Sequence, residues 1–110
     1  GEHRRLFEVE FYEDRSSSEP IKDFIIELQT KGQTSKNDRI RSEKILTYIR
    51  VLQKYGTRAG EPYVKHIEDD IRELRPPDDR IFFFYFKDNT FILFHHFLKK
   101  TKKTPRKEID

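Results

Sequence analysis

The chain has 110 residues and a formal net charge of +3, with 39% charged and 34% hydrophobic residues. This length provides a single hydrophobic core, so we expect one domain over residues 1–110. The absence of cysteine excludes disulfides and cysteine-containing zinc sites, and no apolar run reaches the roughly 20 residues of a membrane-spanning helix, which predicts a soluble, cytoplasmic protein.

The first predicted element is a strand over residues 5–12. Its apolar and acidic side chains alternate, as in a half-buried strand with one charged face, so we expect it at or near a sheet edge. Ser18 and Pro20 then indicate a helix start, with Ser18 as the N-cap. Apolar residues at helical spacing predict a short amphipathic helix over residues 19–30 that ends near Gly32.

A longer second helix is predicted between Ser35 and Gly56. Ser35, followed three residues later by Asp38, forms a capping-box start signal, and Gly56 is a stop signal. The buried stripe of this helix is expected at five positions, Ile45, Tyr48, Ile49, Leu52 and Tyr55. We expect both helices to cover the same face of a sheet.

The segment over residues 57–70 is predicted to be a loop, because it contains Gly60 and Pro62. Within it, residues 63–67 fit either a short extended or a short helical piece. The pattern does not separate these two possibilities.

Most strand-forming residues lie in the last third of the chain. A short strand is predicted over residues 71–75, and a hairpin over residues 80–86 and 91–98, with Asp88 and Asn89 in its turn. The first hairpin strand is apolar on both faces, because its phenylalanines alternate with other apolar residues. We therefore expect both of its faces to be covered.

The resulting order is β-α-α-β-β-β, with the start of a short helix near Pro105. This order predicts a small α+β domain, with an antiparallel-type sheet and the two N-terminal helices packed on one face. Acidic side chains predominate in residues 1–30 and basic ones in residues 31–55, and residues 99–107 hold six cations and no acid. Such a basic patch attracts phosphate backbones or an acidic protein, although a solvated lysine-rich tail has the same composition.

Three stretches of the chain resemble the RelE/HigB superfamily of type II toxins, specifically its phage Gp49-like, HigB-like branch. They are the ELR of residues 73–75, the RIFFFY strand that begins at Arg80, and the FLKKTKKTP run over residues 97–105. The resemblance covers residues 5–110 and implies a RelE-like, microbial-RNase-like fold. It also implies an endoribonuclease that enters the ribosomal A site and cleaves mRNA without a metal or a cofactor, and so inhibits translation.

The same resemblance implies the partners. They are a HigA-like helix-turn-helix antitoxin, expected in a heterotetramer, together with the ribosome and mRNA, while DNA is contacted only through the antitoxin. Two alternatives on the same scaffold stay open, a ParE-like inhibitor of DNA gyrase and a catalytically degenerate toxin that only binds its antitoxin. The density of cations around the candidate site favours RNA.

Metal-independent RNA cleavage needs a base for the 2′-hydroxyl, cations for the phosphorane and an acid for the leaving group. Glu73 and Arg75 share one strand face and Arg80 follows the Pro-Pro turn, so the arginines are candidate cations and Glu73 a candidate base. A plain ion-pair role is the alternative for all three. Lys100 is a further candidate cation, and His66 is the candidate acid-base imidazole.

Further RNA contacts are expected from five flanking basic side chains, Lys65, Arg72, Lys99, Lys102 and Lys103. No metal site is expected. His95 and His96 are neighbours on one strand and point to opposite faces, so they cannot share one metal ion.

Overall fold

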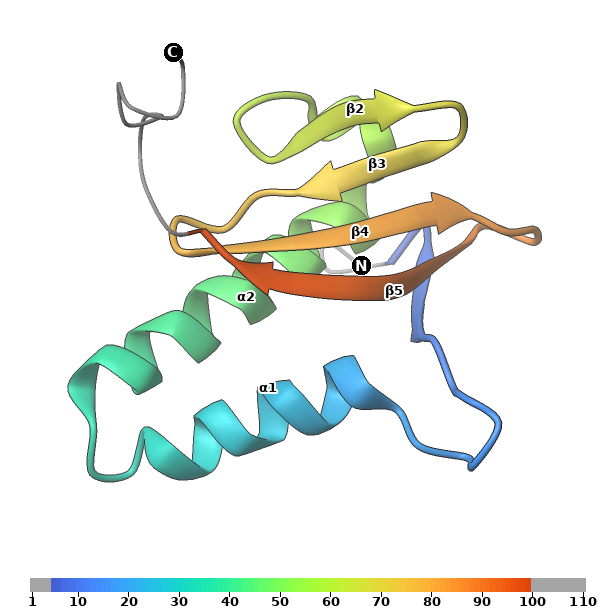
Figure 1. Ribbon diagram of the computed structural model, residues 1–110. Helices are drawn as coiled ribbons and strands as arrows, with labels where there is room; N and C mark the ends of the chain where they lie inside the picture. The colour runs from blue at the N-terminus through green and yellow to red at the C-terminus, as the bar shows by residue number, and fades with distance from the viewer. Residues whose placement is uncertain (1–4, 100–110) are drawn as a thin grey trace, which may run out of the picture.

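In the computed structural model, which describes residues 5–99, two α-helices lie on the same side of a five-stranded sheet (Figure 1). The elements in chain order are β1 (Glu8–Phe11), α1 (Pro20–Lys31), α2 (Lys36–Tyr55), a 3-10 turn η1 (Gly56–Ala59), β2 (Val64–Glu68), β3 (Ile71–Leu74), β4 (Asp79–Tyr85) and β5 (Thr90–Leu98). The strand order is β1-β5-β4-β3-β2, with β4 in the centre. The predicted α+β class is confirmed.

The sheet is mixed, whereas an antiparallel-type sheet was predicted. The pairs β2–β3, β3–β4 and β4–β5 are antiparallel, but β1 pairs with β5 in parallel, with Val9 opposite Phe91. The chain passes through both helices and three strands before it reaches β5. No tight turn therefore dictates the direction of the β1–β5 pair.

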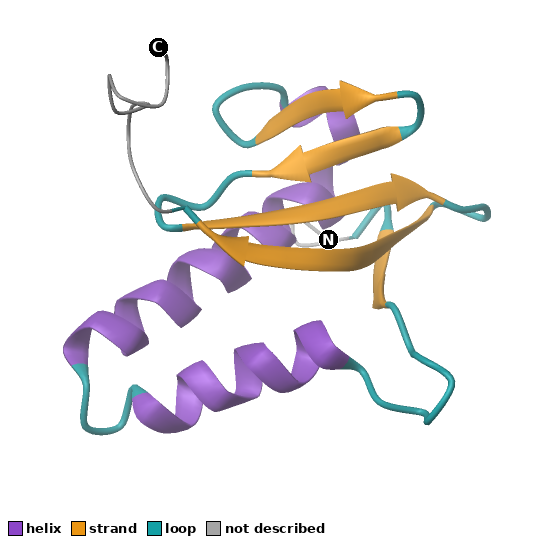
Figure 2. Cartoon of the chain, in the orientation of Figure 1, coloured by secondary structure: helices purple, strands orange, loops and turns teal. Residues whose placement is uncertain are grey.

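The strand β2 resolves the choice that the sequence left open for residues 63–67 in favour of the extended form. It forms a hairpin with β3 at the sheet edge farthest from β1 (Figure 2). Only Val64 of β2 is buried, and its four other residues are exposed. A strand with one buried residue lacks the alternating pattern by which strands are recognised, so the sequence could not decide between the extended and the helical form.

The two helices begin differently. The side chain of Ser35 accepts a hydrogen bond from the Asp38 N–H at 3.3 Å, which confirms the predicted N-cap of α2. The predicted N-cap of α1 is wrong, because that position is Glu19, without a side-chain cap. Ser18 instead belongs to the preceding loop, where its N–H donates to the Asp14 carboxylate at 3.0 Å.

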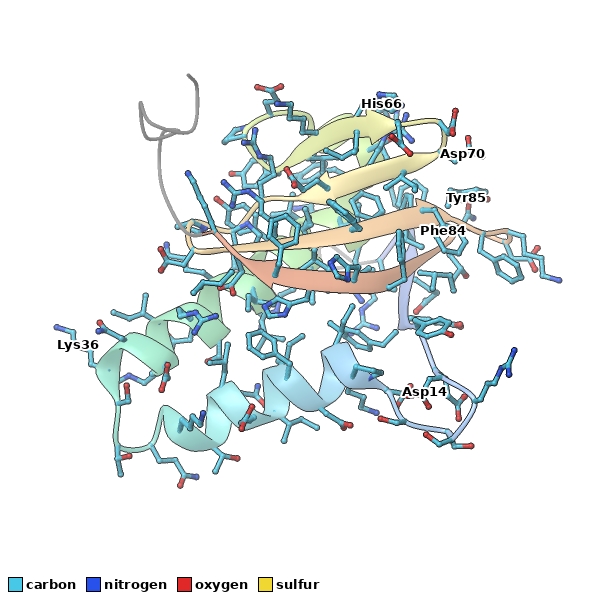
Figure 3. The ribbon with its side chains drawn as sticks, in the orientation of Figure 1. Asp14, Lys36, His66, Asp70, Phe84 and Tyr85 are labelled. Carbon is cyan, nitrogen blue, oxygen red and sulfur yellow. The ribbon has the colours of Figure 1, made fainter. Side chains whose placement is uncertain are left out.

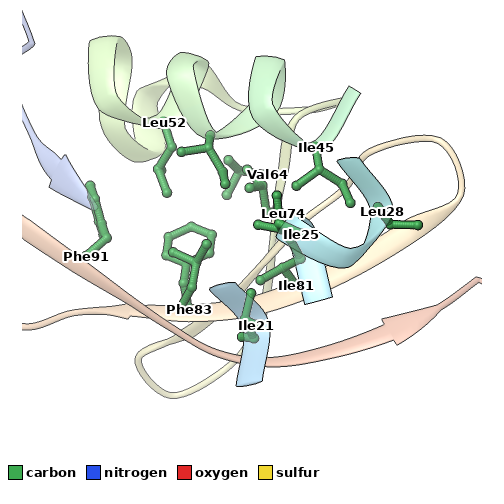
Figure 4. Packing of buried hydrophobic residues seen from close by; sticks show 12 residues of the cluster. Ile21, Ile25, Leu28, Ile45, Leu52, Val64, Leu74, Ile81, Phe83 and Phe91 are labelled. Atoms are coloured by element: carbon green, nitrogen blue, oxygen red, sulfur yellow. The ribbon is translucent and has the colours of Figure 1, made fainter. Parts of the chain in front are cut away.

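The hydrophobic core lies between the helices and the sheet (Figure 4). Its members are Ile21, Ile25 and Leu28 of α1, Ile45, Ile49 and Leu52 of α2, and Val64, Leu74, Ile81, Phe83, Phe91 and Leu93 of the sheet. Tyr48 packs against this core, but Tyr55 is 49% exposed, so its predicted burial is wrong. Tyr55 is the last residue of α2, and its ring contacts Lys54 in place of the core.

The predicted hairpin turn between β4 and β5 is confirmed. Asp88 and Asn89 have φ values of 53° and 58°, the left-handed conformation that two-residue hairpin turns require. Asn89 and Asp88 tolerate this conformation better than most residues. Among residues 5–99, neither helix is long and apolar enough to cross a membrane.

Gly56 ends α2 at a φ of 62°, and a Cβ at this position would lie 2.6 Å from a ring carbon of Phe7. Gly60 has a similar φ of 64°, but a Cβ there would meet only the Arg58 carbonyl oxygen, at 3.8 Å. Alanine at either glycine should cost about 1–3 kcal/mol of folding free energy through backbone strain. Gly56→Ala should cost more than Gly60→Ala, because the Phe7 ring must also move. Urea unfolding of both variants measures this difference, and equal losses would contradict it.

Candidate functional site

The sheet face opposite the helices is open within the described part of the chain. Directly opposed residues of an antiparallel pair share a face. Glu73 is opposite both Lys65 and Phe82, and Arg80 is opposite Phe97. The open face therefore combines charged residues predicted for the site with aromatic residues. It is also the face of β4 that was expected to be covered, and residues 5–99 leave it uncovered.

Glu73 lies between two arginines, and we call Glu73, Arg75 and Arg80 the charged cluster. The Oε1 atom of Glu73 is 3.4 Å from Nε of Arg75 and 3.8 Å from Nε of Arg80. Their side chains are 11%, 28% and 9% exposed, respectively. Two cations share one carboxylate, so one positive charge is not compensated within the cluster. The structure thus brings together three of the residues predicted for catalysis.

The guanidinium of Arg80 is held by the turn before β4. Its Nη1 donates to the carbonyl oxygen of Pro76 at 2.6 Å and to that of Asp79 at 2.8 Å. Burial, and next to it the positive charge of Arg75, lower the pKa of Arg80 from its ordinary value. The positive charge of Arg80 is therefore electrostatically unfavourable in the absence of an anion, and a bound anion would stabilise it. Because the guanidinium is already fixed by two hydrogen bonds, such binding would need little rearrangement.

Arg75 is the more accessible cation of the cluster. Its backbone N–H donates to the carbonyl oxygen of Tyr63 at 2.9 Å, which fixes the main chain just after β3. Its Nε is buried, and within residues 5–99 it makes no hydrogen bond of good geometry, despite the proximity of Glu73. A buried donor without a partner is costly, so Arg75 is held beside Glu73 at an energetic cost.

An aromatic cluster, which we define as Phe82, Phe84, Phe94, His95 and Phe97, occupies the rest of the open face. The ring centre of Phe82 is 5.5 Å from those of His95 and Phe97 and 6.1 Å from that of Phe94. Phe84, which is labelled in Figure 3, joins the cluster through Phe94. The centres of these two rings are 5.6 Å apart. The rings of His95 and Phe97 are exposed, and the other three are half-buried. Accessible rings beside cations form a surface on which unpaired bases stack. These aromatic residues were not predicted to belong to the site.

On the helix side of the sheet, Asp79 is bound by Arg41 and His96, and we call these three residues the Asp79 clamp. Arg41 donates from Nε to Oδ2 at 3.2 Å and from Nη2 to Oδ1 at 2.6 Å. Nε2 of His96 lies 3.2 Å from Oδ1, and Asp79 is 1% exposed. The Phe24 ring packs on His96, with ring centres 3.7 Å apart, and lies 5.6 Å from Cζ of Arg41.

The charge of Asp79 is stabilised by its two partners. Burial by itself raises the pKa of Asp79, but the hydrogen bonds with His96 and Arg41, together with their charges, outweigh burial and lower it below its ordinary value of 3.8. The clamp joins α2 to the start of β4 through a contact that was not predicted from the sequence. No local signal indicates it, because Arg41 and Asp79 are 38 positions apart.

Two residues predicted for the site lie apart from the charged cluster. His66 and Arg72 are opposite each other in the β2–β3 pair, so they share the face opposite to that of Glu73. Nε2 of His66 lies 2.8 Å from the carbonyl oxygen of Asp69, at the exposed edge of the sheet (Figure 3). His66 was predicted in a loop, and its position in a strand determines the side to which it points.

Lys99 follows β5, and its N–H donates to the carbonyl oxygen of Asp78 at 2.9 Å. Strand alternation places it on the side of the sheet that carries Phe97. Lys100, Lys102 and Lys103 lie outside the described residues.

The two adjacent histidines, His95 and His96, face opposite sides, as predicted. His95 belongs to the aromatic cluster on the open face, and His96 to the Asp79 clamp on the helix side. Over residues 5–99, no group of three His, Cys, Asp or Glu side chains is placed to hold a metal ion.

The fold and the open face define a small α+β domain with a basic and aromatic sheet surface. The chain belongs to the phage-derived Gp49-like family (DUF891), whose model matches residues 33–110 and so includes α2 and the strands β2 to β5. This family is toxin-like and related to RelE and HigB, which supports the resemblance found in the sequence and implies an antitoxin partner. A comparison with curated proteins finds no match.

Proposed function

We propose that this protein is the toxin of a type II toxin–antitoxin pair and that it cleaves mRNA on the ribosome. The observation that carries the proposal is the pair of arginines, Arg75 and Arg80, that share Glu73 beside the aromatic cluster. Phosphate binding needs fixed cations, and binding of single-stranded RNA needs exposed rings. Both features occur here on one open sheet face.

In the proposed reaction the scissile phosphate lies against Arg75 and Arg80. The 2′-oxygen attacks the phosphorus and the bond to the 5′-oxygen breaks, which leaves a 2′,3′-cyclic phosphate and a 5′-hydroxyl that takes its proton from solvent. The two guanidinium groups stabilise the negative charge that develops on the phosphorane oxygens. Glu73 orients both arginines and is the candidate base for the 2′-hydroxyl proton. A base next to the scissile bond stacks on the aromatic cluster, and Lys65 and Lys99 contact the flanking backbone. Lys100 stays in the proposal as an additional cation.

The proposed partners follow from this activity. The ribosome presents mRNA to the open face, and a HigA-like antitoxin holds the toxin inactive until it is removed. Growth arrest should therefore depend on the ratio of toxin to antitoxin.

The proposal is tested by inducing the chain without an antitoxin and mapping the 5′ ends of cellular mRNA. We expect growth arrest and cuts inside translated reading frames. Blocking translation should protect the same transcripts, because the ribosome positions the substrate. Loss of DNA supercoiling with intact mRNA would instead identify a gyrase inhibitor. A protein that binds its antitoxin but causes neither effect would be a degenerate toxin.

A further inference from the structure

The turn between β3 and β4 forms a socket for the Arg80 guanidinium. The Pro76 carbonyl oxygen accepts two hydrogen bonds, from the Asp79 N–H at 3.3 Å and from Nη1 of Arg80 at 2.6 Å. The Asp79 carbonyl oxygen accepts a further bond from the same Nη1 at 2.8 Å. The first and last residues of this four-residue turn thus determine where the guanidinium lies.

The turn over residues 76–79 is only weakly stabilised by hydrogen bonds between its own residues. Pro77 and Asp78 at its tip are exposed, and its internal hydrogen bond, from Asp79 to Pro76, is long at 3.3 Å. The Lys99 N–H adds one bond, to the Asp78 carbonyl oxygen. A proline at the second turn position restricts the backbone there, but it donates no further hydrogen bond. The position of Asp79 therefore needs support from outside the turn.

Strand β5 supplies part of that support, because Asp79 pairs with Leu98 and Nε2 of His96 lies 3.2 Å from Oδ1 of Asp79. Helix α2 supplies the rest. Arg41 holds both carboxylate oxygens of Asp79 in a fork, which fixes the orientation of the carboxylate as well as its distance. Arg41 lies one turn before Ile45, which is fully buried in the core, so the fork is attached to a rigid part of the fold. Its guanidinium is in turn packed against Phe24 of α1.

We propose that Arg41 is a positioning residue for transition-state stabilisation at the scissile phosphate and that it acts on Arg80 through Asp79. This inference rests on the proposed function. Arg41 fixes the Asp79 side chain, the Asp79 carbonyl fixes Nη1 of Arg80, and Arg80 is thereby held on the open face beside Glu73. Arg41 does not touch the substrate, because it lies on the helix side of the sheet. Its effect is on the geometry of Arg80 and not on the charge of the open face.

The test uses Arg41→Lys in the full chain, with Arg50→Lys as the matched control. Lysine keeps the positive charge next to Asp79, but it cannot hold both carboxylate oxygens, whereas Arg50 is an exposed arginine of the same helix. We expect the kcat of ribosome-dependent mRNA cleavage to fall on the order of tenfold or more, since a displacement of about 1 Å can cost a hundredfold. KM should stay within about twofold of the wild-type value, because the charged residues of the open face are unchanged. Arg50→Lys should match the wild type in both.

A second measurement does not depend on activity. In ¹⁵N-labelled protein, the Arg80 guanidinium held by two carbonyls should rotate slowly and give separate Nη signals, which Arg41→Lys should merge and Arg50→Lys should keep. If the wild type cleaves no mRNA, the proposed function fails, while this measurement still decides whether Arg41 positions Arg80. Unchanged Arg80 signals in folded Arg41→Lys would overturn the inference. So would a loss of activity that only follows the unfolded fraction measured by circular dichroism.

Discussion

Replacing Arg75 with alanine should lower the rate of mRNA cleavage by a few hundred-fold, the effect of losing about 3–4 kcal/mol of transition-state stabilisation. The fold should survive this change. The Arg75 side chain is 28% exposed, and the bond from its backbone N–H to Tyr63 is kept. Arg80→Ala is a less clean test, because it would leave the buried carbonyl of Pro76 without its guanidinium donor. Cleavage in a reconstituted translation system and circular dichroism of the same protein together measure the two effects.

Arg50→Ala is the control for Arg75→Ala. It removes the same unit of charge from an exposed position on α2, far along the chain from the charged cluster. Its loss should weaken ribosome binding slightly and in a salt-dependent way, without a comparable change in cleavage. A folded Arg75→Ala protein that still cleaves mRNA at the wild-type rate would remove Arg75 from the site.

The elements that were predicted correctly are those whose residues contact the core at regular spacing. Ile45, Ile49 and Leu52 carry the helical period of α2, and all three are buried. The strand β2 offers only Val64 to the core, so periodicity could not identify it. The parallel pairing of β1 with β5 could not be predicted from the sequence either. It joins segments about 80 positions apart, and no tight turn between them limits the relative direction of the strands.

In the candidate site too, contacts between residues close in the sequence were predicted, and contacts between distant residues were not. Glu73, Arg75 and Arg80 were predicted to converge because strand alternation and a short turn bring them together within eight positions. The alternation that creates the aromatic cluster was also visible. The exposure of these rings on an open surface was not predictable, because it depends on which face of the sheet the helices leave uncovered. The contact of Arg41 with Asp79 depends on how α2 lies on the sheet, and no sequence pattern reports that.

Asp79→Ala should lower the free energy of unfolding by about 3 kcal/mol near neutral pH. Among the described residues, it leaves Arg41 with only the ion pair to Asp38, at 4.0 Å, and leaves His96 without its partner. Breaking a buried pair costs about 3–5 kcal/mol. We place the value at the lower end because Arg41 is 21% exposed and can regain some hydration. Since domains are typically stable by only about 5–15 kcal/mol, the loss should be plain in urea unfolding. Asp78→Ala is the control, because Asp78 is exposed and its backbone, not its side chain, bonds Lys99.

The stability gap between the wild type and Asp79→Ala should also depend on pH, and the lowered pKa of Asp79 sets the direction. Burial opposes the charged form, but the bonds with His96 and Arg41 outweigh it, so folded Asp79 holds its proton less tightly than the unfolded chain does. The contribution of its charge is therefore fully present above the unfolded value of 3.8 and is lost as the pH falls through the lower folded value. Other carboxylates titrate in both proteins and cancel in the difference. The gap should thus narrow as the pH falls below the unfolded value. A gap that persists unchanged at about pH 2 would show that packing, and not the charge of Asp79, holds α2 to the start of β4.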